Sequence, residues 1–222
     1  MNEPLAAGRL VEAAPADEAA RTAQVLQSLQ ARQGVDPAPA APALSPRMRA
    51  FVQSVDRAVL AVARHWLLAV NLISGVFAVL PVLAPWLLAR GVAFPANAIY
   101  FLYHFTCHQL PSRSFFIFGH QLAYCERDTA IYSGFFLLGL AYALVKGRIR
   151  PLAWRWLFLL WVPMALDGFT QLFGWRESTW ELRVVTGALF ALSCVWFGFP
   201  YLEQGFRDIR TQLEARFARV AA

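Results

Sequence analysis

The sequence predicts an all-α integral membrane protein with about four transmembrane helices, and three observations carry that prediction. The chain has 222 residues, of which 58% are hydrophobic and only 15% are charged. In a soluble domain about a quarter of the residues are charged. Apolar runs long enough to cross a bilayer recur between residues 65 and 200. The alternation of apolar and polar residues that marks a membrane β-barrel is absent from the sequence.

The N-terminal part precedes the membrane domain. Residues 1–44 are rich in alanine and proline and are expected to form a disordered cytoplasmic tail, in which the run 37–42 is typical of an extended linker. A helix over residues 17–33 is predicted inside this tail, with an apolar face too narrow to fold alone. Ser45-Pro46 is a helix start, and residues 45–64 are predicted to form an amphipathic helix at the membrane interface.

The membrane domain is predicted to occupy residues 65–200. Its four spans are 66–88, 129–145, 152 to about 173, and about 182–199. After it, residues 201–222 repeat the amphipathic pattern, with an apolar stripe and arginines off that stripe. Such a helix is expected to lie on the surface beside anionic lipid headgroups.

The net charge of +6 would suggest a nucleic-acid partner in a soluble protein. Here the basic residues lie at the ends of the apolar runs. This placement indicates that they set the orientation of the chain in the membrane, and we expect no nucleic-acid partner. They precede the first span, join the second to the third (Lys146, Arg148 and Arg150), and follow the fourth. The positive-inside rule therefore predicts a multi-pass protein of the cell membrane with both termini in the cytoplasm.

This orientation leaves residues 91–128 and 174–181 on the outer side. Residues 98–120 are apolar enough to pass for a fifth span, but a fifth span would move the basic connection at 146–150 to the outside. We therefore expect a re-entrant or helical-hairpin segment that enters the membrane from its outer face.

Two of the four histidines and one of the three cysteines fall in the stretch 103–116 within this outer segment. His104, Cys107 and His108 have the spacing i, i+3, i+4 and would share one face of a helix. Cys107, His108 and Cys125, with His104 or Asp128 as a fourth ligand, suit zinc in ligand type and number. The alternatives are a disulfide between Cys107 and Cys125, which an oxidising outer face favours, or two free thiols.

A second polar stripe lies at the outer end of the third span and includes Asp167 and Gln171. An acid within an apolar helix marks a proton or ion path, a catalytic acid or base, or the partner of an arginine. The catalytic hypothesis makes Asp167 a general base, while Arg113, Arg176 and Arg183 bind an anionic headgroup or phosphate. The structural hypothesis pairs Asp167 with one of these same arginines.

The motifs at 107–116, 125–132 and 167–178 together resemble the membrane family called domain of unknown function 2085. The resemblance covers roughly residues 98–190. It implies the membrane architecture and the same set of polar site residues, but it implies no reaction.

Three functional hypotheses follow. The first is a membrane protein with a polar site at the outer face that acts on a lipid-linked or other anionic amphiphilic substrate. The second is a non-catalytic scaffold or complex subunit with membrane-protein partners, whose outer motif a disulfide or a metal stabilises. The third is a small transporter, which ranks last because the sequence has no internal repeat.

Overall fold

The computed structural model describes residues 15–32 and 45–221, and these form six α-helices and one short hairpin. The chain divides after Arg49 into two compact units. The first contains α1 (Pro15–Arg32), which confirms the helix predicted at 17–33, and its described side chains, at 20–29, are exposed. The expected linker at 37–42 lies outside the described residues.

Helix α2 (Pro46–Ala89) is one continuous helix of 44 residues. It starts where the sequence predicts, because the Ser45 hydroxyl accepts a hydrogen bond from the backbone N–H of Met48 at 3.3 Å. The predicted boundary between an interfacial helix and the first span, at residues 64/65, is not a break in the helix. The prolines Pro81 and Pro85 lie in its last turns.

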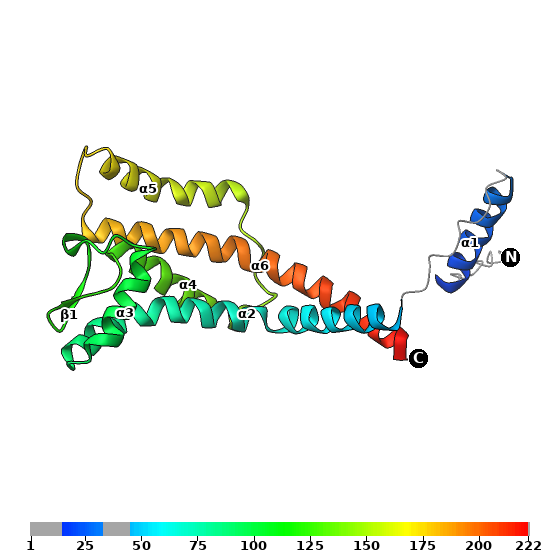
Figure 1. Ribbon diagram of the computed structural model, residues 1–222. Coiled ribbons are helices and arrows are strands. Elements are labelled where there is room, and N and C mark those ends of the chain that lie inside the picture. The colour runs from blue at the N-terminus through cyan, green and yellow to red at the C-terminus, as the bar shows by residue number, and fades with distance from the viewer. Residues whose placement is uncertain (1–14, 33–44, 222) are drawn as a thin grey trace, which may run out of the picture. The chain divides into compact units, whose positions relative to one another are not determined.

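Three further helices run roughly along the direction of α2 in Figure 1, and α6 lies between α5 and α2: α4 (Glu126–Val145), α5 (Trp154–Leu172) and α6 (Trp180–Ala221). Helix α6 packs against both α4 and α5. An aromatic and aliphatic cluster joins α2, α4 and α6, and its buried members are Trp66, Leu67, Tyr142, Val195 and Phe199. Rings in this cluster meet edge to face, such as Trp66 on Phe199 at 5.6 Å between centroids.

The predicted separate helix at 201–222 is instead the C-terminal part of α6, which continues through Pro200. Two ion pairs tie it to the N-terminal half of α2: Arg64 to Glu214 at 2.7 Å and Arg216 to Asp56 at 2.9 Å. The two amphipathic segments therefore continue the apolar helices and pair with each other, while their place at the membrane interface stays a prediction.

The segment between α2 and α4 is irregular. Helix α3 (Ala93–His104) is followed by a 3₁₀ turn, Pro111–Arg113, and a hairpin of β1 (Phe116–Ile117) and β2 (His120–Gln121). A continuous fifth span over 98–120 is therefore absent. Because α3 ends at His104, the prediction that His104, Cys107 and His108 share a helix face is wrong.

In the described part of the chain, three helices are long and apolar enough to cross a membrane: α2, α4 and α6. Helix α5 has 19 residues but carries Arg155 and Asp167, which lower its hydropathy. The all-α architecture is confirmed, while the count of four spans and the re-entrant segment stay predictions.

A buried carboxylate marks the end of the bundle where α4 finishes. Glu203 is only 4% exposed and accepts hydrogen bonds from Trp66 Nε1 at 3.0 Å and from Arg210 at 3.2 Å. Lys146, just after α4, lies 3.1 Å from it. Helix α4 runs from this basic end to Glu126 at the opposite end, and its 20 residues measure about 30 Å, the thickness of a bilayer core.

Candidate functional site

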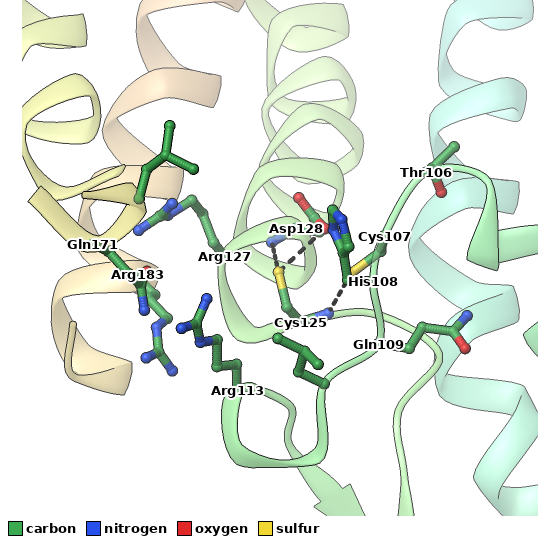
Figure 2. Close-up of a pocket in the computed structure, with 12 residues that line it drawn as sticks. Thr106, Cys107, His108, Gln109, Arg113, Cys125, Arg127, Asp128, Gln171 and Arg183 are labelled. Carbon is green, nitrogen blue, oxygen red and sulfur yellow. Dashed lines mark hydrogen bonds between the residues drawn. The ribbon is translucent and has the colours of Figure 1, made fainter. Parts of the chain in front are cut away.

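A cavity of about 460 Å³ lies at the end of the bundle where α4 begins (Figure 2). Its lining comes from the irregular segment after α3, the first turn of α4, the last turns of α5 and the first turns of α6. The lining residues are Thr106, Cys107, His108, Gln109, Leu110, Arg113, Cys125, Arg127, Asp128, Gln171, Leu172 and Arg183. Four segments that lie far apart in the sequence thus supply one site.

Glutamine side chains hold the irregular segment in place. Gln109 has a left-handed backbone, with φ of 50°, which is uncommon for a residue with a side chain. Its amide donates to the carbonyls of Tyr100 at 2.8 Å and Ala123 at 3.1 Å. The Gln121 amide in turn donates to the Gln109 carbonyl at 2.6 Å. These bonds fix the backbone on both sides of Cys107 and His108.

Two cysteines and an aspartate meet at one side of the cavity. The sulfur atoms of Cys107 and Cys125 and a carboxylate oxygen of Asp128 all lie within 4.8 Å of one another. The Cys125 thiol donates to Asp128 Oδ2 at 3.1 Å, and the Cys125 backbone N–H donates to Cys107 Sγ at 3.2 Å. Both cysteines are free thiols in the structure, so the metal and the disulfide both stay predictions.

The pKa values of the two thiols shift in opposite directions. A side-chain interaction between the two thiols lowers the pKa of Cys107, because it stabilises the Cys107 thiolate. The same side-chain interaction, together with burial, raises the pKa of Cys125. His108 lines the cavity but is not in the three-residue cluster, and His104, exposed at the end of α3, is not in the lining.

Asp167 is almost fully buried, at 2% exposure, and both of its oxygens are occupied. One oxygen accepts from Arg176, and the other accepts from Arg127 and from the Ser178 hydroxyl, the latter at 2.8 Å. Arg176 also donates to Thr170 Oγ1 at 3.1 Å. The carboxylate therefore joins α4, the end of α5 and the loop before α6.

Arg183 forms a second buried ion pair, with Glu126 at 2.7 Å, and it also donates to the Ser178 carbonyl. Arg113 faces the amide of Gln171. When the amide oxygen is turned toward the guanidinium, it accepts from Nε and Nη2 at 3.2 Å each. Three guanidinium groups from three different elements therefore reach one cavity (Figure 2).

The structure brings together most of the residues that the sequence singles out. Arg113, Gln171 and Arg183 line the cavity, whereas Arg176 pairs with Asp167 outside the lining. No role was predicted from the sequence for Glu126, Arg127 or Ser178. Glu126 and Arg127 belong to a charged triplet, 126–128, directly before an apolar span, and this pattern could have identified them.

Residues 107–197 match the sequence model of the family described as "Predicted membrane protein", domain of unknown function 2085. An uncharacterized protein of Methanocaldococcus jannaschii is 41% identical over 110 residues, which cover 48% of this chain and 70% of that protein. This chain belongs to the domain of unknown function 2085 family. A second relative, from Methanothermobacter thermautotrophicus and also named uncharacterized, is 39% identical over 85 residues, or 38% of this chain and 77% of the relative.

No solved structure matches the chain. The region matched by the family contains all of the cavity-lining residues except Thr106. The family, together with the apolar helices, makes this chain a membrane protein.

Proposed function

We propose that this member of the domain of unknown function 2085 family binds the anionic headgroup of an amphiphilic molecule at the outer face of the cell membrane. The observation that carries the proposal is the cavity itself. Arg113, Arg127 and Arg183 line it, and among the described residues Asp128 is the only acidic one in its lining. Arginine presents a planar fork of donors that matches phosphate and carboxylate geometry.

The arginines are not equally available to a ligand. Arg127 and Arg183 are paired with the buried carboxylates of Asp167 and Glu126, which hold their side chains in position. The Nε of Arg183, in a side chain 92% buried, has no partner in the described part of the chain. Arg113 forms no ion pair among the described residues and faces only the neutral Gln171. Arg113 is therefore the guanidinium group with free charge for an anion.

An anion in this cavity has apolar neighbours. Leu110 and Leu172 line the cavity. Apolar side chains beside an arginine-lined pocket suit a molecule with a charged head and a hydrocarbon tail. They support an amphiphile over a free anion.

Asp167 acts in this proposal as a positioning residue. Its two oxygens already accept from two guanidinium groups and a hydroxyl, so little acceptor capacity is left for a substrate proton. The ion-pair hypothesis accounts for these contacts better than the general-base hypothesis.

The outer position of the cavity rests on the charge distribution. The connection from α4 to α5 carries Lys146, Arg148 and Arg150, and the cavity is at the other end of α4, one bilayer thickness away. With the basic end in the cytoplasm, four spans and a re-entrant segment at 98–120 follow, and both termini are cytoplasmic.

The second hypothesis, a scaffold or complex subunit, has one observation in its favour. Apolar side chains are exposed along the N-terminal half of α2, where Phe51 is 65% and Val62 59% exposed. Partner helices could cover them, and lipid covers them equally well. Anion binding by the purified protein separates this hypothesis from the first.

The test uses the purified full-length protein and dioctanoyl phosphatidic acid, with dioctanoyl phosphatidylcholine and inorganic phosphate as comparison ligands, measured by calorimetry. The phosphatidic acid is expected to bind more tightly than either. Arg113→Gln should weaken its binding by about 10- to 100-fold, since a hydrogen bond to a charged group contributes about 1.5–3 kcal/mol.

The matched control is Arg148→Gln, which removes the same charge at the opposite end of the bundle and should leave affinity unchanged. Equal affinity in the wild type and Arg113→Gln would contradict the proposal. If inorganic phosphate binds as tightly as the lipid, the ligand is a free anion and not an amphiphile.

A further inference from the structure

We propose that Cys107, Cys125 and Asp128 form a binding site for a thiophilic divalent cation, zinc, that fastens the irregular segment to the start of α4. The proposal is independent of anion binding by the arginines. It also revises the zinc site expected from the sequence, because neither His104 nor His108 belongs to the cluster.

The three ligand atoms already face one another. All lie within 4.8 Å, and two ligands at zinc–sulfur distances of about 2.3 Å in a tetrahedral site are roughly 3.8 Å apart. Closing the cluster around an ion therefore requires only small side-chain rotations. Figure 2 shows the two sulfur atoms and the Asp128 carboxylate turned toward the same point.

Hydrogen bonds hold the three ligand residues in position. Cys125 is the N-cap of α4, and its sulfur accepts from the backbone N–H of Asp128 at 3.4 Å. Asp128 is three residues further on, so both lie on the same face of the first turn. Cys107 is buried, at 6% exposure, in a backbone that the Gln109 amide fixes on both sides.

The charges of the cluster call for a cation. Asp128 forms no ion pair in the part of the chain that the structure describes, although three arginines line the same cavity. Its carboxylate accepts a hydrogen bond from the Cys125 thiol. Thiolates and a carboxylate are ligand types that zinc accepts, whereas magnesium and calcium bind oxygen ligands.

The three side chains fill three of four tetrahedral positions. All three residues line the cavity, so the fourth position faces it and is open to water. A zinc ion at this point would join the segment after α3 to α4, the connection that a Cys107–Cys125 disulfide would otherwise make.

The test uses the full-length protein expressed with zinc, and elemental analysis of the purified protein in detergent. Zinc is expected at a stoichiometry of about one per chain. Cys107→Ser and Cys125→Ser should lose it, and Asp128→Asn should release it to a weaker chelator than the wild type requires. Replacement by cobalt should give the intense near-ultraviolet absorption of thiolate-to-cobalt charge transfer, which both serine variants lose.

Cys194→Ser is the matched control, because Cys194 lies in α6 outside the cluster. This variant keeps only Cys107 and Cys125 and should keep its zinc. Thiol counting after unfolding in chelator should find both cysteines reduced. A disulfide in Cys194→Ser, or two free thiols with no zinc after zinc is added, would overturn the proposal.

Failure of the metal site and failure of the anion site are distinguishable. Arg113→Gln should bind zinc like the wild type and lose only phosphatidic acid. If Asp128→Asn folds and retains zinc against the same chelator as the wild type, the aspartate is not a ligand and the three-ligand site is wrong.

Discussion

The buried ion pair between Arg183 and Glu126 shows how single residues hold the site together. The two side chains are 8% and 10% exposed and lie 2.7 Å apart. Arg183 extends from α6 to the first turn of α4, so the pair joins two helices directly beneath the cavity. Burying two charges is costly, and removal of one partner leaves the other charge buried without compensation.

Glu126→Gln is accordingly expected to destabilise the protein by about 3 kcal/mol, which lowers the thermal midpoint by roughly 6–12 °C for a protein of this size. Thermal unfolding in detergent measures the effect. The exposed Glu177 provides a control, since Glu177→Gln removes the same charge with no buried partner. The double change Glu126→Leu and Arg183→Met should recover much of the loss, because no unpaired charge remains. A midpoint for Glu126→Gln equal to that of Glu177→Gln would contradict the structural role of the pair.

At the residue scale the sequence pointed to charged residues that the structure places together, but it did not predict most of their pairs. Asp167 pairs with Arg176, as one hypothesis held, and also with Arg127, which had no assigned role. Arg183 pairs with Glu126 and not with Asp167. Spacing along a helix tells which residues share a face, but the choice of partner depends on how neighbouring helices are rotated. The rotation of neighbouring helices cannot be read from a single sequence, because it is set by how the side chains pack between them.

At the scale of elements, close contact between α4 and α6 positions the arginines. Gly134 and Gly187 allow this approach. A Cβ atom at Gly134 would meet the Cβ of Ala191 at 2.7 Å, and one at Gly187 would meet the backbone oxygen of Arg127 at 2.8 Å. The second contact is with backbone, which cannot rotate away. A side chain at 187 therefore moves the first turn of α4, and Arg127 moves with it.

Gly187→Ala is expected to destabilise the protein by about 1–3 kcal/mol through overpacking and to weaken phosphatidic acid binding. Thermal unfolding and calorimetry on the same sample measure the two effects. Gly198→Ala is the matched control in the same helix, because a Cβ there meets nothing within 4 Å. It should leave binding unchanged and, since alanine favours a helix interior, should not lower stability. Equal behaviour of the two variants would show that α4 and α6 are not in close contact at Gly187.

The sequence predicted the long helices and missed the hairpin, and the reason is physical. Apolar runs of about 20 residues have few alternatives to a helix in a membrane. The hairpin, in contrast, has strands of two residues each, and its turn places Phe118 and Gly119 at positive φ values of 53° and 77°. Asn or Gly normally occupies the first turn position. Because Phe118 stands there, the sequence gives no indication of a hairpin turn. The register that pairs Ile117 with His120 follows from that turn.

At the scale of the whole molecule, the open question is whether α5 crosses the membrane. Its 19 residues measure about 28 Å, enough to span. The mean hydropathy of α5 treats Asp167 as an unpaired charge. In the structure two arginines and a serine donate hydrogen bonds to its carboxylate. The cost of placing a paired and buried acid near the end of a span is much lower than that of an isolated one. We therefore predict that α5 crosses alongside α6, although α5 is not among the helices that qualify by composition.

The topology is tested by reporter insertions after Arg150, before α5, and after Glu177, behind it. If α5 crosses, green fluorescent protein should be fluorescent only at the first position and alkaline phosphatase active only at the second. If α5 does not cross, both insertions report the same side, which removes the fourth span. Phosphatase activity after Arg150 alone would reverse the orientation and place the arginine cavity in the cytoplasm. The expected result requires both the positive-inside placement of Lys146, Arg148 and Arg150 and the neutralisation of Asp167, so the experiment tests the charge argument at both ends of the bundle.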